Sequence, residues 1–216
     1  MVPLLEGVRQ DFGLPFVAVI RRDGGVVAAT APPAGSGIVT PTALGHRRYF
    51  LQALAEGRSV QYLLGRSSST PGLYFARRVD DGGDVRGVVV VKQETEVLSR
   101  LLGDADRATV AVTDANGVVV LSNRPALLAQ RLPGLPPLDE IDRQETYQEA
   151  PPPTPLRWTG AEAGSGLPAG GLMLADGRRH MMQSGLLGSL PMSAWVLEPL
   201  DDEARVRGEI AIGAGG

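Results

Sequence analysis

The chain has 216 residues and a formal net charge of −3 at pH 7, and 43% of its residues are hydrophobic. These values are typical of globular proteins, so wholesale disorder, a collagen-like fibre and a bundle of membrane helices are excluded. The absence of cysteine excludes disulfides, thiol catalysis and zinc–thiolate sites. The acidic balance provides no basic field that would attract nucleic acid, and the arginines are scattered among acidic residues.

No targeting signal is expected from either end of this sequence. Met1–Leu5 lacks the basic and long apolar regions of a secretory signal, and no apolar run approaches the roughly 20 residues of a membrane span. Two interpretations fit: a small cytosolic protein, or a soluble piece of a longer chain.

The sequence repeats one pattern. Residues 16–30 and 109–122 are both rich in β-branched and small apolar residues around an Asp/Asn-Gly turn, which predicts two β-hairpins. A Pro-Ala pair follows each hairpin, at Pro33 and Pro125. Two copies of one module explain this pattern better than a solenoid, which needs three or more repeats.

Similar elements are predicted to follow each hairpin. After the first, we expect a helix from Thr42 to Gly57, capped by Thr42, then strands over 59–64, 73–79 and 86–92 and a linking helix over 94–102. After the second, we expect a short helix over 126–132, a loop over 133–155, strands near 156–159, 171–175, 180–184 and 194–200, and a last helix from Asp201 to about Ala211.

These elements predict an α+β fold of two tandem modules, each with a five-stranded antiparallel sheet and flanking helices. The expected divisions are a partial N-terminal helix over 1–15, a first module over 16–102, a second over 103–200 and a C-terminal helix over 201–216. The modules should meet near residues 103–108.

The motifs of common enzymes are absent: there is no G-x-S-x-G, P-loop, H-E-x-x-H or EF-hand loop. The two histidines, His46 and His180, lie on different modules, so no metal site is indicated, and no cofactor is expected. The paired acids fall in turns or helix caps, where solvated carboxylates are the usual state. We therefore expect no catalysis in this chain.

One cluster of polar residues suggests anion binding. Lys92 is the single lysine beside 20 arginines, and strand alternation places it on the same side as Val88 and Val90. Arg47 falls in an apolar helix stripe with Leu44, Leu51 and Leu54, where an unpaired cation is costly to bury. Both could hold a carboxylate. Alternatively, both cations reach solvent or pair with Asp80, Asp81 or Glu94.

Three stretches resemble the sensor region of C4-dicarboxylate sensor histidine kinases: residues 46–54, 65–74 and 87–92. That family has, in this order, an Arg-Pro-Tyr-Phe helix motif, a Gly-Thr-Thr-Ser loop ending in Pro-Gly-Tyr-Tyr, and a Gly-Val-Val-Val-Lys strand. The 114–117 turn also resembles the start of the family's second module. The resemblance implies a double PAS-like, or double Cache, fold, with the ligand in the membrane-distal first module.

By position, the resemblance implies a ligand site that comprises Arg47, Lys92, Ser67, Ser68, Tyr74, Tyr49 and His46. Arg48, Leu44, Leu73 and Ala76 replace residues usual in the family. The last three are expected to remove polar groups from the site, so a monocarboxylate or a more apolar acid fits as well as a C4-dicarboxylate.

The resemblance further implies an extracytoplasmic sensing domain of a transmembrane histidine kinase, anchored through flanking segments and homodimeric in the full-length protein. The partner would be a small organic carboxylate. A chemoreceptor sensor, an enzyme of unrecognised type and a non-catalytic protein-interaction module remain alternatives.

Overall fold

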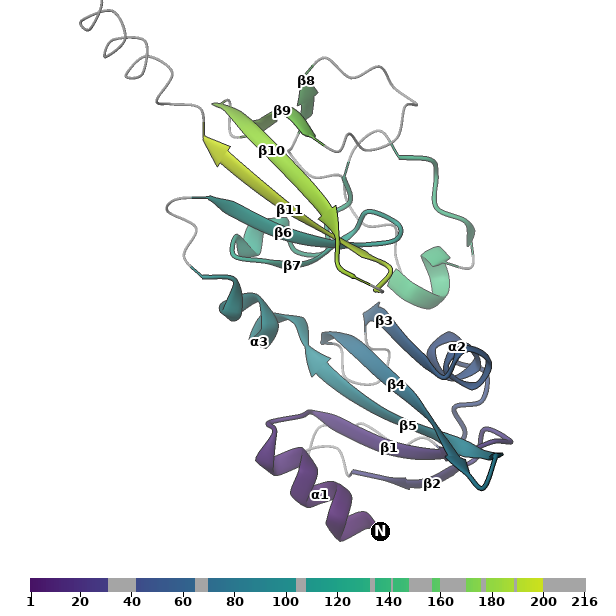
Figure 1. Cartoon of the computed structure of the whole chain (residues 1–216). Helices are drawn as coiled ribbons and strands as arrows, with labels where there is room; N and C mark the ends of the chain where they lie inside the picture. The colour runs from purple at the N-terminus through teal and green to yellow at the C-terminus, as the bar shows by residue number, and fades with distance from the viewer. Residues whose placement is uncertain are drawn as a thin grey trace, which may run out of the picture. The chain divides into compact units, whose positions relative to one another are not determined.

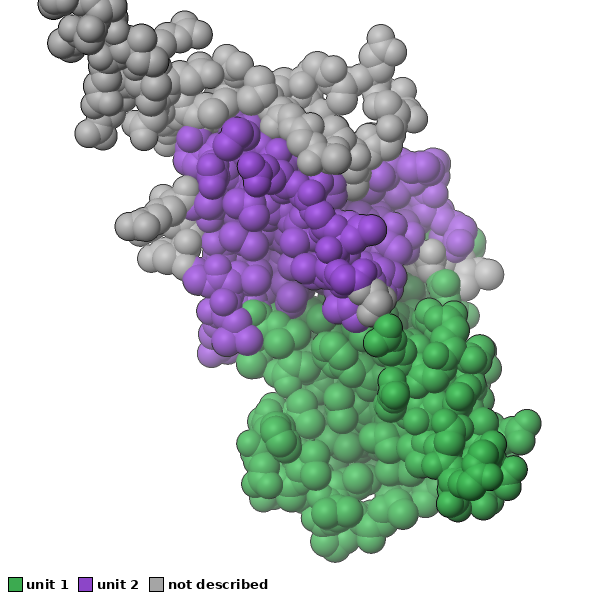
Figure 2. All heavy atoms as spheres, in the orientation of Figure 1, with its two compact units in different colours: residues 1–98, 140–149 green, residues 99–139, 150–216 purple. Residues whose placement is uncertain are grey.

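The computed structural model describes residues 1–30, 42–64, 70–103, 108–132, 135–140, 142–147, 157–159, 170–175, 178–188 and 190–199. The chain forms two compact units (Figure 2). Unit 1 comprises residues 1–98 and 140–149, and unit 2 comprises residues 99–139 and 150–216. The predicted helix from Asp201 to Ala211 lies outside the described residues.

Each unit contains one antiparallel sheet (Figure 1). The sheet of unit 1 has the order β2-β1-β5-β4-β3, formed by β1 (Phe16–Arg21), β2 (Val26–Ala29), β3 (Arg58–Leu64), β4 (Pro71–Asp81) and β5 (Asp84–Glu94). The sheet of unit 2 has the order β7-β6-β11-β10-β9-β8, formed by β6 (Thr109–Asp114), β7 (Val119–Ser122), β8 (Arg157–Thr159), β9 (Gly170–Ala175), β10 (Arg178–Leu186) and β11 (Met192–Pro199). The predicted tandem α+β fold is confirmed. The strand predicted near 156–159 forms the edge strand β8, so the second sheet has six strands and not the five expected.

The repeat seen in the sequence extends to irregularities of the backbone. The first hairpin shifts register between Val19 and Ile20, and the second shifts between Val112 and Thr113. Each hairpin also makes an isolated bridge to a later residue, Gly25 to Ala43 and Val118 to Arg131. A register shift and a bridge at matching places support two copies of one module better than two unrelated hairpins.

The first helix after a hairpin is shorter than predicted. Helix α2 spans Arg48–Glu56, and Arg47, not Thr42, is its N-terminal cap residue. The backbone of residues 42–44 is used elsewhere: Val26 N donates to Thr42 O, and Leu44 N donates to Gly24 O. The helix ends as predicted at Gly57, whose φ of 85° is a left-handed conformation that favours glycine.

The apolar face of α2 also differs from the prediction. Tyr49, Phe50 and Ala53 are buried against the sheet, whereas Leu51 is 52% exposed. The predicted stripe began at Leu44, within a helix expected to start at Thr42. Because Leu44 precedes the observed helix, the helical spacing counted from it wrongly placed Leu51 on the buried face, although Leu54 does pack against the core.

Helices cover both faces of the unit 1 sheet. Helix α2 packs on the face that carries Ala18, Ile20, Val88 and Val90. On the opposite face, α1 (Val2–Asp11) packs Leu5 against β1 and β2. A π-helix over Asp142–Tyr147 (η3) packs along β3, and its Tyr147 ring lies 6.2 Å from that of Tyr62. This helix falls in the segment predicted to be a loop.

Unit 2 has its own core. Ala111, Val119, Met182, Trp195 and Leu197 are buried together, and the Trp195 indole donates to the Thr113 hydroxyl at 2.9 Å. The linking segment forms α3 (Thr95–Ser99) followed by a 3-10 helix over Arg100–Leu102, as predicted. The helix predicted over 126–132 is wrong: a 3-10 turn over Pro125–Leu127 is followed by a second turn with Ala129 at a φ of 60°, after which Arg131 bridges back to Val118.

Candidate ligand-binding site

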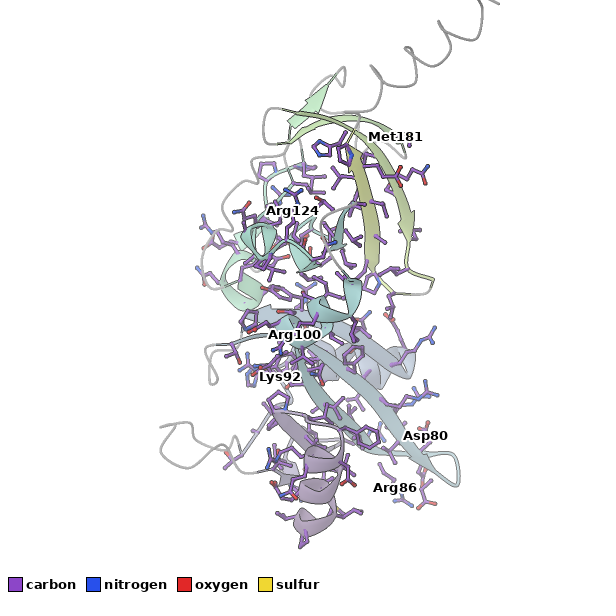
Figure 3. All side chains as sticks on the ribbon, turned by 90° about the vertical axis from the view of Figure 1, so that its left-hand side faces the viewer. Asp80, Arg86, Lys92, Arg100, Arg124 and Met181 are labelled. Atoms are coloured by element: carbon purple, nitrogen blue, oxygen red, sulfur yellow. The ribbon has the colours of Figure 1, made fainter. Side chains whose placement is uncertain are left out.

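Lys92 lies on β5 with its side chain on the face covered by α2. It is 1% exposed and shares this face with the buried Val88 and Val90. The prediction from strand alternation is therefore confirmed. Figure 3 labels this lysine in unit 1. The free-energy cost of burying this ammonium group must be offset by hydrogen bonds or by an opposite charge.

Among the described residues, Thr70 provides such hydrogen bonds. The Lys92 ammonium donates to the Thr70 carbonyl and to the Thr70 hydroxyl, both at 2.8 Å. The hydroxyl in turn donates to the Glu94 carboxylate at 3.3 Å. Burial lowers the pKa of Lys92, and the negative charge of Glu94 partly opposes that shift. The cation is thus hydrogen-bonded but still disfavoured by desolvation.

Gly72 leaves room for the lysine stem. A Cβ at this position would lie 2.5 Å from Lys92 Cε and 3.0 Å from the Gln93 carbonyl oxygen. A side chain at residue 72 would therefore displace the lysine. This close approach gives a physical reason for the glycine of the Pro71-Gly72 pair.

Two stacked tyrosines stand beside Lys92. The rings of Tyr49 on α2 and Tyr74 on β4 are 5.3 Å apart and nearly parallel. Lys92 Nζ lies 5.9 Å from the centre of the Tyr74 ring, within the range of a cation–π contact. Burial raises the pKa of both phenols, so both are neutral hydrogen-bonding groups at physiological pH.

Arg47 is the second cation. It is half-buried at the N-terminal end of α2, and its positive charge opposes the raised pKa of Tyr49 and Tyr74. Within the described part of the chain, no carboxylate forms a salt bridge with its guanidinium. The charges of Arg47 and Lys92 thus both act on Tyr74. Because no described carboxylate pairs with the Arg47 guanidinium, this group retains its capacity to bind an anion.

Gln61 is a polar residue of this face that the sequence analysis missed. It lies on β3 directly opposite Tyr74, which is itself opposite Lys92 on β5. Its neighbours two residues away, Ser59 and Leu63, contact α2 and the core of that face. A single amide in an apolar strand has no sequence signature. Its alternation with Ser59 and Leu63 was the available signal.

The other predicted site residues are distributed differently. His46 is exposed in the turn before α2, and its assignment stays a prediction. Ser67 and Ser68 lie outside the described residues. Leu44 and Ala76 are buried in the core beside Tyr49, on the site face.

Leu73 lies on the other side of the sheet. It pairs with Tyr62 and precedes Tyr74, so its side chain points away from Lys92. The expectation that Leu73 removes a polar group from the site was wrong.

Metal binding has no geometric support in the part of the chain that the structure describes, where no three His, Asp or Glu side chains converge. Among the described helices, none combines the length and hydropathy needed to span a bilayer. The observed features are instead two cations, two neutral phenols, a hydroxyl and an amide on one face of the sheet. This set is suited to an organic anion.

No family model matches the sequence. Over 159 residues, the chain is 31% identical to the C4-dicarboxylate transport sensor protein DctB of Pseudomonas aeruginosa. The chain is a homologue of the C4-dicarboxylate sensor proteins. The DctB protein of Rhizobium meliloti is also 31% identical, over 127 residues. These matches cover 71% and 56% of this chain but only 25% and 19% of the two DctB proteins, so the chain spans about a quarter of their length or less.

Solved structures agree with this homology in fold. The sensor domain of the histidine kinase DctB from V. cholerae has a TM-score of 0.70 at 22% identity, covering 92% of this chain and 77% of that one. The periplasmic domain of RsbU from Chlamydia trachomatis has a TM-score of 0.65 at 11% identity, covering 97% and 78%. The chemoreceptor domain PctB of Pseudomonas aeruginosa, solved with L-Arg, has a TM-score of 0.58 at 12% identity, covering 93% and 75%. This DctB homologue thus has the double PAS-like fold of sensor domains.

Proposed function

We propose that this chain is the extracytoplasmic sensing region of a membrane-bound sensor histidine kinase and that unit 1 binds a small organic carboxylate. The supporting observation is the pair of cations on one face: Arg47, whose guanidinium is unpaired in the described structure, and Lys92, which is buried beside Tyr74. Homology to the DctB sensor proteins favours a kinase output, since the chemoreceptor domains resemble this chain only in fold.

Arg47 and Lys92 would bind the carboxylate in different ways. The guanidinium would bind a carboxylate through two parallel hydrogen bonds, and the ammonium would add a point charge in a dry environment. The neutral phenols of Tyr49 and Tyr74 would donate further hydrogen bonds. Ser67, Ser68 and His46 are proposed to complete the site. Leu44 and Ala76 make its surroundings apolar, which favours a small or partly apolar acid.

Ligand binding should stabilise the chain against unfolding. At a hundredfold excess over Kd, the expected gain is about 2.7 kcal/mol. The test is urea unfolding of wild type, Arg47→Gln and Arg77→Gln in a series of mono- and dicarboxylates. Arg77 is an exposed arginine on β4 and serves as the matched control.

The proposal predicts stabilisation of wild type and Arg77→Gln by at least one acid and none of Arg47→Gln. If an acid stabilises all three proteins equally, the site lies elsewhere. If no acid stabilises the wild type, the proposed function itself is wrong.

Signalling would require the ligand to favour one of two arrangements of the full-length protein. We propose that this protein is a membrane-anchored homodimer, with ligand recognition in the module over 16–102. Leu4 of helix α1 and Phe12, the residue directly after that helix, are exposed apolar side chains, at 70% and 73% exposure. Light scattering of a chain extended upstream should show a dimer. A monomer at high concentration would contradict this part of the proposal.

A further inference from the structure

Gln61 places an amide on the site face of β3. Ser59, two residues earlier, donates its hydroxyl to the Tyr49 carbonyl of α2 at 2.7 Å. Leu63, two residues later, is buried in the core that contains Tyr49 and Phe50. Because side chains alternate along a strand, Gln61 points to the same side as these two neighbours. It therefore faces the layer between the sheet and α2.

The amide lies in one row with the candidate anion-binding residues. Gln61 is opposite Tyr74, and Tyr74 is opposite Lys92. Neighbouring strands are about 4.8 Å apart, so the backbones at Gln61 and Lys92 are separated by about 10 Å across Tyr74. The Tyr74 side chain projects from the same face between Gln61 and Lys92, and the Tyr49 ring is stacked on it.

The second observation concerns the amide oxygen of Gln61. Gln61 Oε1 is buried and has no hydrogen-bond partner among the described residues. Native proteins rarely leave a buried amide oxygen unpaired. Beside a candidate ligand site, the missing partner is naturally a donor on the ligand.

The charge of the site selects the kind of donor. Arg47 and Lys92 both place positive charge near Tyr74. A ligand ammonium would be repelled by these cations, whereas a neutral hydroxyl would not. An acid without a donor would leave the buried oxygen unpaired in the complex.

We propose that Gln61 accepts a hydrogen bond from a hydroxyl group of the bound carboxylate, so that this site prefers hydroxy acids to the corresponding unsubstituted acids. This inference rests on the proposed carboxylate site and specifies its ligand class. Loss of a hydrogen bond to a buried acceptor weakens binding by about 10- to 100-fold. That ratio is the expected preference.

The test compares matched acids by titration calorimetry: lactate with propionate, 3-hydroxybutyrate with butyrate, and 2-hydroxysuccinate with succinate. Wild type should bind the hydroxylated member of at least one pair about 10- to 100-fold more tightly. Gln61→Leu keeps a similar volume and removes the acceptor, so it should bind both members of that pair with similar affinity. Gln93→Leu is the control, because Gln93 is adjacent to Lys92 but faces the opposite side of the sheet.

The outcomes separate this inference from the proposed function. If no acid binds wild type, the carboxylate site is wrong and the inference falls with it. If acids bind but no pair differs, or if Gln61→Leu retains the preference, the role of Gln61 is refuted and the carboxylate site stands. Unfolding of ligand-free Gln61→Leu monitors folding, and it should be at least as stable as wild type because the unpaired oxygen is gone.

Discussion

Replacing Lys92 with methionine tests whether this buried cation serves binding or stability. Methionine has a similar length and a flexible apolar stem, so it fits the space that Lys92 occupies over Gly72. The substitution removes a 1% exposed ammonium and its two hydrogen bonds to Thr70. Two large effects on the free energy of unfolding then oppose each other.

The two effects are similar in size. Each hydrogen bond from a charged donor contributes about 1.5–3 kcal/mol, so the two described bonds to Thr70 account for about 3–6 kcal/mol of the loss. Removing the desolvation penalty of a buried ammonium returns several kcal/mol. Replacement of buried charges by apolar groups of similar volume is often neutral, or stabilising by about 1–4 kcal/mol. We therefore expect ligand-free Lys92→Met to be as stable as wild type or more stable.

Ligand binding should respond in the opposite way. Wild type should gain about 2.7 kcal/mol at a hundredfold excess of a bound acid, and Lys92→Met should gain nothing. Lys92→Arg should also bind more weakly, because the planar guanidinium is bulkier than the ammonium. Urea unfolding with and without acid measures each effect. Arg86→Met is the control, because Arg86 is an exposed cation on the same strand, with 59% of its side chain accessible.

The pH dependence gives a second measurement. The pKa of Lys92 is lowered in the folded chain, so the folded state releases this proton at a lower pH than the unfolded state. The unfolded state then binds more protons, and stability rises with pH up to the ordinary lysine value of 10.5. The stability of wild type relative to Lys92→Met should increase across that alkaline range. If Lys92→Met is destabilised by more than about 3 kcal/mol, the lysine is a structural cation and this reasoning is refuted.

Two further substitutions test the packing around the site. Gly72→Ala should cost about 1–3 kcal/mol of unfolding free energy and weaken carboxylate binding, because its Cβ would collide with the Lys92 stem. Gly185→Ala, a strand glycine with open space around it, should do neither, and equal effects of the two would contradict the argument. Tyr147→Ala removes a 4% exposed ring packed on Tyr62 and should cost about 3–5 kcal/mol in urea unfolding. A cost below about 1 kcal/mol would show that η3 contributes little to unit 1.

Much of the fold was predictable because strands and turns carry local signals. The Asp/Asn-Gly turns located both hairpins, and strand alternation placed Lys92 on the buried face. The start of α2 was not predictable from helical spacing. It depends on backbone hydrogen bonds between residues 42–44 and the hairpin turn, and on a close approach of Gly45 to Gly24. These contacts join distant parts of the sequence.

The site was predictable where a charge interrupted an apolar pattern, and not elsewhere. Lys92 and Arg47 were candidates because cations are costly to bury. Gln61 carries no charge and belongs to no motif, so only its pairing with Tyr74 reveals its place in the row. The π-helix over Asp142–Tyr147 lies in a segment rich in proline and acids, and it is fixed by the tertiary contact of Tyr147 with Tyr62.

The membership of residues 140–149 in unit 1 has a practical consequence for dissecting the protein. Both flanking segments, 99–139 and 150–216, belong to unit 2, so the polypeptide passes from one unit to the other three times. A single cut after residue 98 would remove Tyr147 from its place against Tyr62. An isolated first unit therefore needs residues 140–149 grafted back onto it. The second unit needs a short bridge between residues 139 and 150 in their place.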